Sequence, residues 1–481
     1  MRKFSNVNYI YLNILKIIKK FLYNINPARV INWLVILVIL YSMFNVKYWN
    51  KENKVFYGDV ISYYAYLPAT FIYKDITLSF TENYKGEHKF IIYGKKTFTG
   101  IKAIKMTMGL SILYSPFFFL GHIGAKIFGY DSGGFSAPYI FALLMSCIFY
   151  LSIGLYFLRK ILQHYFSKIV TAITIVFIVF GTNLFFYSSF RAPVSHAYSF
   201  SLIAIFLYLT IKWHERSTLI NTILLGLISG LITLIRPTNV IVLIFILLWG
   251  VSSKKEFIER LKYFIRNYYL ILIMIGSFII VLIPQLLYWK IVSGHFIYYS
   301  YGEEGFLFAN PQIIRGMFSY RNGWLVYSPI MILSLIGFLF LFRKQKEFFL
   351  PTLIFTLLNI YIILSWWCWW YVGFGQRAFI DSYSILAIPM AAFIGWTLKQ
   401  KKLIKISILT VALLFFSLGV FHTIQYCHGS IHFNSMTKAA YWESFGKIRQ
   451  TSKFWSLLES PDSQKAVKGI QAIKPKKKVG K

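Results

Sequence analysis

VINWLVILVILYSMFNVK, residues 30–47, is the stretch that decides the fold class of this chain. It is apolar over a length that crosses a bilayer core of about 30 Å as one helix. Apolar runs of roughly 17–25 residues recur along the sequence. Only 14% of the 481 residues are charged, whereas a soluble domain carries about 25%. The sequence therefore predicts an all-α polytopic membrane protein.

The apolar runs are best interpreted as eleven transmembrane helices. The stretch at 109–128 is also apolar, but Pro116, Gly121 and Lys126 favour a kinked surface or re-entrant segment. Counting it as a span would also place the basic loop at 159–168 outside, against the charge pattern of the other loops. The predicted spans are 30–47, 136–158, 169–187, 196–211, 219–235, 238–252, 268–288, 327–342, 348–366, 379–397 and 404–422.

The basic residues set the predicted orientation. Short loops rich in lysine and arginine stay in the cytoplasm. With eleven spans, the amino terminus and all such loops are cytoplasmic, and the carboxy terminus is outside. The formal charge of +35 is then explained by topology, so we expect no nucleic-acid partner. The basic loops are 159–168, 212–216, 254–266, 343–346 and 399–405.

This topology divides the chain into three parts. Residues 1–29 form a basic cytoplasmic arm, and no small-residue cleavage site follows the first span, which favours an uncleaved signal-anchor. Residues 30–422 form the transmembrane domain, with a large first external loop at 48–135 that carries juxtamembrane helices. Residues 423–481 form an external polar tail whose lysine-rich end is expected to be disordered. Three cysteines show neither a disulfide framework nor metal-binding spacing.

Asp59 is the first candidate for chemistry. It lies in YGDVISYYAYLPA, residues 57–69, about a dozen residues beyond the first span. The aromatic spacing fits a short amphipathic helix at the membrane interface. A carboxylate there could deprotonate an acceptor hydroxyl or ligate a divalent cation, although aspartate is also a favoured helix N-cap. Asp75 is a second acid in this loop, but Asp75-Ile76-Thr77 also fits a turn or cap.

Basic residues predicted on the same face are candidates for binding a phosphate. Arginine binds phosphate oxygens in bidentate fashion, and lysine binds as a point charge. The alternative for each is snorkelling toward lipid headgroups, and for His196 an ordinary interfacial position. Arg236 and Arg377 are favoured because they lie at span ends beside helix breakers. The phosphate-binding candidates are Lys102, Arg191, His196, Arg236 and Arg377.

A further group could contact the acceptor or a sugar. Glu303 and Glu304 are the only acids in their loop and could bind hydroxyls, or only solvate a turn. Trp370 belongs to a dense aromatic cluster at 366–371, which an interfacial aromatic belt also explains. The candidates for acceptor or sugar contact are Asp75, Glu303, Glu304, Asp381 and Trp370.

Several of these features together resemble the C-type (GT-C) integral membrane glycosyltransferases, and are similar to protein O-mannosyltransferases and lipid A aminoarabinose transferases. The shared features are the Gly58-Asp59 acid with its aromatic trail, the large first loop, and residues 115–118, 234–239 and 375–381. By architecture the resemblance covers roughly residues 30–420. It implies a polyprenyl-phosphate-linked sugar as donor and a GT-C-like fold.

The resemblance also implies a role for Asp59 as catalytic base or metal-linked residue. The family often has two adjacent acids at this position, whereas Val60 follows Asp59 here. The acid-His-Pro-Pro pattern of the second loop is absent as well. Donor identity and the need for a divalent cation are therefore left open, and no other cofactor is indicated.

The resulting expectation is a multi-pass glycosyltransferase in the cell membrane, in a bacterium the inner membrane, with its active site facing outward. It would move a sugar from a polyprenyl phosphate to a lipid, glycan or protein acceptor. The alternatives are a transporter or flippase, and a ligase or polymerase, of lipid-linked glycans. Transporters place charges in mid-membrane on broken helices, whereas these spans are nearly free of charge.

Overall fold

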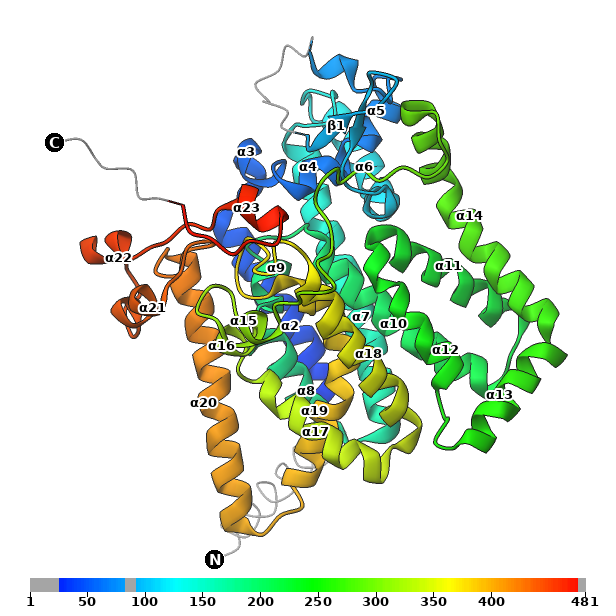
Figure 1. The fold of residues 1–481 in the computed structure, drawn as a ribbon, viewed down its shortest axis with the longest axis vertical. Coiled ribbons are helices and arrows are strands. Elements are labelled where there is room, and N and C mark those ends of the chain that lie inside the picture. The colour runs from blue at the N-terminus through cyan, green and yellow to red at the C-terminus, as the bar shows by residue number, and fades with distance from the viewer. Residues whose placement is uncertain (1–25, 83–91, 475–481) are drawn as a thin grey trace, which may run out of the picture.

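The computed structural model describes residues 26–82 and 92–474, and this part of the chain is mostly helical (Figure 1). The end of the predicted lysine-rich tail and most of the predicted cytoplasmic arm lie outside the described residues. The longer helices are α2 (Pro27–Val46), α6 (Gly109–Ile127), α7 (Ala137–Tyr165), α8 (Lys168–Phe180), α10 (Ser195–Glu215), α11 (Leu219–Ile235), α13 (Lys254–Arg266), α14 (Tyr268–Ser293), α17 (Met331–Lys344), α18 (Lys346–Ser365), α19 (Tyr383–Thr397) and α20 (Lys402–Cys427).

Short elements connect them. The short helices are η1 (Tyr48–Asn50), α3 (Glu52–Val55), α4 (Asp59–Tyr64), α5 (Tyr66–Phe71), η2 (Ser79–Thr81), α9 (Leu184–Ser188), η3 (Pro237–Leu243), α12 (Ile244–Leu248), α15 (Ile313–Phe318), α16 (Trp324–Tyr327), η4 (Arg377–Ser382), α21 (Lys438–Ser444), α22 (Ser452–Ser456) and α23 (Ser463–Val467). The strands are β1 (Gly94–Lys96) and β2 (Lys102–Ile104).

Among the described residues, seven helices are long and apolar enough to cross a membrane. They confirm the prediction of a mostly helical membrane protein, while the count of eleven spans stays a prediction. Six of the seven coincide with predicted spans, and the seventh is α6, which lies in the stretch that we left out at 109–128. The seven are Pro27–Asn50, Gly109–Ile127, Ala137–Tyr165, Tyr268–Ser293, Lys346–Ser365, Arg377–Thr397 and Lys402–Cys427.

The remaining predicted spans fall on helices that are broken, shorter than 18 residues or less apolar. The predicted span 169–187 consists of α8 and α9, which are separated by Gly181 and Asn183. Likewise, the span predicted at 238–252 consists of η3 and α12. Length alone therefore excludes these segments from the seven.

Burial distinguishes the centre of the bundle from its perimeter. The segment Arg377–Thr397, which contains α19, is 94% buried over its most apolar window, whereas α14 and α20 are 22% and 11% buried. In Figure 1, α14 and α20 stand on opposite sides of the molecule. We infer that α19 belongs to the core and that α14 and α20 face lipid. Helix α10, buried along most of its length, packs between α7, α11 and α19.

The first loop gathers at one end of the molecule, at the top of Figure 1, and the turn between α19 and α20 lies at the opposite end. The short helix predicted after Asp59 is present as α4 and α5, but its tyrosines Tyr63, Tyr64 and Tyr66 are buried in protein rather than displayed to lipid, and of its aromatic residues only Phe71 at its end is exposed. Their hydroxyls find partners there: Tyr64 donates to the Gly134 carbonyl (2.5 Å) and Tyr66 to the Met106 carbonyl (2.7 Å).

The loop also contains an antiparallel β1–β2 hairpin, with Gly94 opposite Ile104 and Lys96 opposite Lys102. The hairpin is tied to α14, because the Ile104 amide donates to the Tyr288 hydroxyl at 2.8 Å.

Candidate functional site

The backbone before α4 positions Asp59. Gly58 has φ +63° and ψ −132°, a conformation that a residue with a Cβ adopts only under strain. This turn directs the first residue of α4 toward η4. The Asp59 carboxylate there accepts from the Arg377 guanidinium at 2.9 Å. The two side chains are 24% and 20% exposed, so the ion pair remains open to solvent or a ligand.

Arg377 is held in place by the loop that precedes it. Both backbone groups of Phe374 are bonded: its N–H donates to the Tyr187 hydroxyl (2.8 Å), and its carbonyl accepts from Asn183 Nδ2 (3.0 Å). Gly375 adopts φ +59° beside Asn183, which lets the chain turn into η4. The backbone that leads into Arg377 is therefore fixed by polar residues around α9.

One turn after Arg377, Asp381 organises a buried network. Its carboxylate accepts from His196 Nδ1 (2.9 Å), Asn239 Nδ2 (2.9 Å) and Arg236 (3.3 Å). Asp381 and His196 are each only 4% exposed. The carboxylate is thus enclosed by three donors, and it orients His196 and Arg236 rather than presenting its oxygens to a sugar.

Arg191 is the third arginine of this region, after Arg377 and Arg236. It lies between α9 and α10, and its guanidinium stacks 3.7 Å from the centroid of the Tyr57 ring. Burial, reinforced by the charge of Arg377, lowers the pKa of Arg191 to about 10, which still leaves it protonated at neutral pH. The Arg191 guanidinium thus lies beside Gly58 and close enough to Arg377 for the two charges to interact. We call this group the Asp59 site; it consists of Asp59, Arg191, His196, Arg236, Arg377 and Asp381.

Opposing effects determine the charge of the acid. Burial raises the pKa of the Asp59 carboxyl, but the Arg377 guanidinium outweighs burial and brings that pKa below its usual range. Burial, together with the charge of Asp59, raises the pKa of Tyr63 to about 12. At neutral pH the site therefore holds a carboxylate beside a neutral phenol.

A second ion pair lies near this site. Lys105 contacts Glu304 at 2.5 Å, and the Trp367 indole donates to the same carboxylate at 2.9 Å. The charge of Lys105 also acts on Asp59. Of the two adjacent acids predicted to bind an acceptor, Glu304 is thus fixed near the Asp59 site, whereas Glu303 is exposed.

Three other candidates do not join the Asp59 site. Lys102 is exposed on β2. Asp75 caps a turn, because it accepts from the Thr77 amide (3.0 Å) and the Phe80 amide (2.8 Å). Trp370 is buried and donates to Asn434 at 2.7 Å. Asp75 and Trp370 therefore occupy local structural positions.

Sequence reasoning assigned no role to several residues that the structure places at the site. Asn239 lies in the quoted motif at 234–239, and its position after Pro237 was a signal that could have found it. Tyr57 adjoins the quoted Gly58-Asp59 pair, and only its contact with Arg191 reveals its role. Asn183 and Tyr187 carry no such signal, because they act through the backbone of Phe374.

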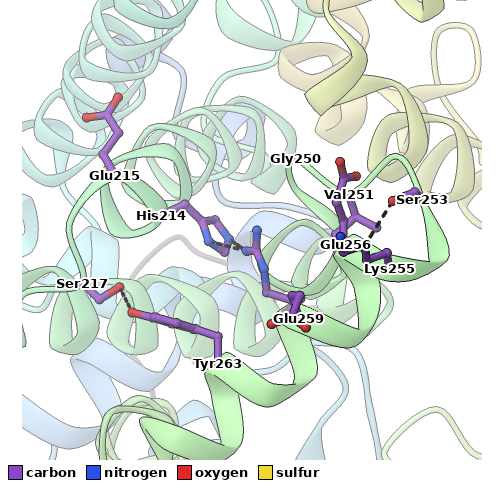
Figure 2. Close-up of a pocket in the computed structure, with 11 residues that line it drawn as sticks. His214, Glu215, Ser217, Gly250, Val251, Ser253, Lys255, Glu256, Glu259 and Tyr263 are labelled. Atoms are coloured by element: carbon purple, nitrogen blue, oxygen red, sulfur yellow. Dashed lines mark hydrogen bonds between the residues drawn. The ribbon is translucent and has the colours of Figure 1, made fainter.

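The larger of two prominent cavities is not at this site. It measures about 680 Å³ and lies at the other end of α10, beside α12 and α13 (Figure 2). Two of its charged groups are already partnered: Arg260 contacts His214 and donates to the Trp249 carbonyl (2.9 Å), and Glu256 accepts from the Ser252 amide (2.6 Å). We therefore do not assign the chemistry to this cavity.

The part of the chain that the structure describes contains no group of three or more histidine, cysteine, aspartate or glutamate residues placed to hold a metal ion. The nearest charged partner of Asp59 is a guanidinium rather than a second acid.

Neither a protein-family model nor a curated protein matches this sequence. Its function is therefore inferred from the geometry of the Asp59 site.

Proposed function

We propose that this chain is a membrane glycosyltransferase that moves a sugar from a polyprenyl-phosphate donor to an acceptor hydroxyl at the outer face of the cell membrane. The observation that carries the proposal is the partly exposed Asp59–Arg377 pair, with Arg191 and Arg236 beside it. A carboxylate at a site that holds more positive than negative charge suits a reaction in which a phosphate leaves and a hydroxyl loses its proton.

In the proposed reaction the acceptor oxygen attacks the anomeric carbon of the sugar. The bond from that carbon to the phosphate oxygen breaks, and the lipid phosphate departs with the electron pair. Asp59 takes the acceptor proton. Arg377 and Arg191 hold the phosphate charge, and such fixed electrostatic stabilisation is usually the largest catalytic contribution. Attack opposite the leaving phosphate inverts the anomeric configuration.

The ion pair itself suggests how donor binding activates the base. In the free protein the pKa of Asp59 lies below its usual range because of Arg377, which makes Asp59 a weak base. A donor phosphate that binds Arg377 supplies an anion to the same guanidinium. Asp59 then loses part of its counter-charge while remaining partly buried, so its pKa rises. The acid becomes basic when the donor is present.

The Asp381 network has a supporting role in this proposal. Asp381 holds Arg236 at 3.3 Å, and Arg236 is 18% exposed, so its outer face is available to an anion. Asp381 is accordingly a positioning residue.

The test compares two carboxylates of the first loop in membranes supplied with a lipid-linked sugar. Asp59→Asn should lower turnover by roughly 10²–10⁴-fold, the usual contribution of a general base. Asp75→Asn is the matched control and should retain near wild-type turnover, because Asp75 caps a turn. Retained turnover in Asp59→Asn would reject the base assignment.

A second readout separates an enzyme from a flippase. Wild-type protein in vesicles should release the polyprenyl phosphate as the sugar moves to the acceptor. Transbilayer movement of an intact lipid-linked sugar, with no polyprenyl phosphate released, would favour the flippase instead.

A further inference from the structure

A second cavity, of about 340 Å³, opens between the segment after α15, the tryptophan cluster and the carboxy-terminal segment. Among the residues that line it are Arg315, Tyr320, Arg321, Trp369, Lys438 and Gln471. In Figure 1, α15, α21 and α23 lie on the flank of the molecule that carries the upper end of α20. None of these residues belongs to the Asp59 site.

The cavity is lined by more positive than negative charge. Arg315, Arg321 and Lys438 line it, and Glu459 is the one acid among its lining residues. Arg321 donates to the main-chain carbonyl of Glu459 at 2.9 Å, and no ion pair joins the two side chains among the described residues. Arg315 donates to the Gln312 side chain at 3.0 Å. In the part of the chain that the structure describes, no carboxylate forms an ion pair with Arg315, Arg321 or Lys438, so their positive charge is not neutralised.

Two buried donors in the wall lack partners among the described residues. They are Arg321 Nε and Gln471 Nε2. The Gln471 amide orientation is set by Trp369, whose indole N–H can only donate and does so to Gln471 Oε1 at 3.0 Å. Gln471 Nε2 is left as a donor. Buried donors without partners are costly and rare. Both atoms lie behind the surface of the cavity, so a ligand oxygen would satisfy them after a small turn of the side chain.

The wall also offers an aromatic surface, and it is joined to the Asp59 site. Tyr320 lines the cavity and is partly exposed, as a ring that contacts a sugar face would be. The main-chain carbonyl of Trp369 accepts from the Gln376 side chain, directly before Arg377. A ligand in this cavity would therefore lie against the same loop that positions Arg377.

We propose that this cavity binds the anionic part of the acceptor, a glycan that carries a phosphate or carboxylate group. The assignment of the ligand as the acceptor rests on the proposed function, whereas the binding of an anionic sugar does not. Arg315, Arg321 and Lys438 bind the anionic group, and Gln471 and Tyr320 contact the sugar.

The test measures binding of glucose 6-phosphate to the detergent-solubilised full-length protein by titration calorimetry. The double variant Arg315→Gln/Lys438→Gln, at two exposed positions, should weaken binding by roughly tenfold or more, as expected when charge-assisted contacts are lost. The matched control, Lys401→Gln/Lys402→Gln, removes the same charge from exposed positions before and in α20 and should bind like wild type. Arg321→Gln, if it folds, should weaken binding as well.

Two further measurements identify the site and the ligand class. Arg377→Gln should retain glucose 6-phosphate binding, because the probe is expected in the cavity. Binding lost in Arg377→Gln but kept in the cavity variant would overturn the proposal. Inorganic phosphate that competes as strongly as glucose 6-phosphate would overturn the assignment to a glycan. None of these readouts uses turnover, so a failed Asp59 test leaves them independent.

Discussion

Helix α10 carries a histidine near each end, and the two ends differ in what surrounds it. His196 donates to the buried carboxylate of Asp381. His214 instead contacts Arg260 and stacks on Trp249, with ring centroids 5.5 Å apart and planes 13° apart. At about 1.5 Å per residue, the 21 residues of α10 separate these ends by about 30 Å. The first histidine is oriented by an acid, and the second fills a packing position.

The balance of charge separates the two ends further. The cavity beside His214 is lined by three acids, Glu215, Glu256 and Glu259, and two cations, Lys255 and Arg260. At the Asp59 site three arginines face two acids. Of these two ends, only the Asp59 site therefore has more positive than negative charge. Cavity size alone would have selected the end at His214 instead.

Removing one arginine from each end tests this difference most strongly. Arg377→Gln should lower glycosyl transfer by roughly 10²–10³-fold, the cost of losing one fixed group that stabilises developing charge. Arg260→Gln should leave transfer near wild type, because Arg260 is engaged with His214 and the Trp249 carbonyl. Initial rates with a lipid-linked sugar measure both variants. Equal losses in the two would show that the effect is on folding.

Neutralising one acid at each end should lower the stability of the protein by different amounts. Asp381→Asn leaves Arg236 without its buried counter-charge, which costs about 3 kcal/mol of unfolding free energy. Glu256→Gln should have little effect, since Glu256 is exposed. The midpoint of thermal denaturation in detergent measures this. An unchanged midpoint in Asp381→Asn would contradict the role of Asp381 in holding Arg236.

The dependence on pH should separate the free protein from the donor complex. In the free protein burial raises the pKa of Asp59, and Arg377 brings it below the usual range. If donor phosphate draws on Arg377, the pKa rises in the complex. The acid limb of kcat, which reports the complex, should then lie at higher pH than that of kcat/KM, which reports the free protein. Coincident limbs would contradict activation by donor.

The lowered pKa of Asp59 also determines how the stability of the protein depends on pH. Because the folded pKa of Asp59 is lowered, its ion pair stabilises the protein at pH values above the usual aspartate range. This stabilisation is lost as the pH falls through the folded pKa.

The smallest effect is expected from the ring under Arg191. Tyr57→Leu removes a cation–π contact worth about 1 kcal/mol, which should raise KM for the donor roughly fivefold. Tyr57→Phe keeps the ring and should restore the wild-type value. A fivefold rise in Tyr57→Phe as well would assign the effect to the hydroxyl instead.

The sequence was a good guide to helices and a weaker guide to their ends. Apolar runs predicted α2, α7, α14, α18 and α20 because composition alone marks a segment that lipid surrounds. The sequence did not predict where the helix within such an apolar run is interrupted. The β1–β2 hairpin was missed because its strands are three residues long and rich in lysine.

The site could be predicted in part for a related reason. Asp59, Arg236 and Arg377 stand out as charged residues beside helix breakers, and the structure brings them to one end of the molecule. Asp75 shows the limit of this reasoning, since an acid in the same loop proves to be a local cap. The enclosure of Asp381 by three donors depends on tertiary packing, which no spacing pattern records.

The two partners of the Asp59–Arg377 pair are 318 residues apart in the chain, and this separation has a consequence for biosynthesis. At ~5–20 residues per second, a ribosome needs tens of seconds to travel from one codon to the other. During that interval the first loop has left the ribosome while its counter-ion does not yet exist. The carboxylate therefore gains its partner only after the bundle has been largely inserted, and a nascent chain interrupted before that point contains the acid without a working centre.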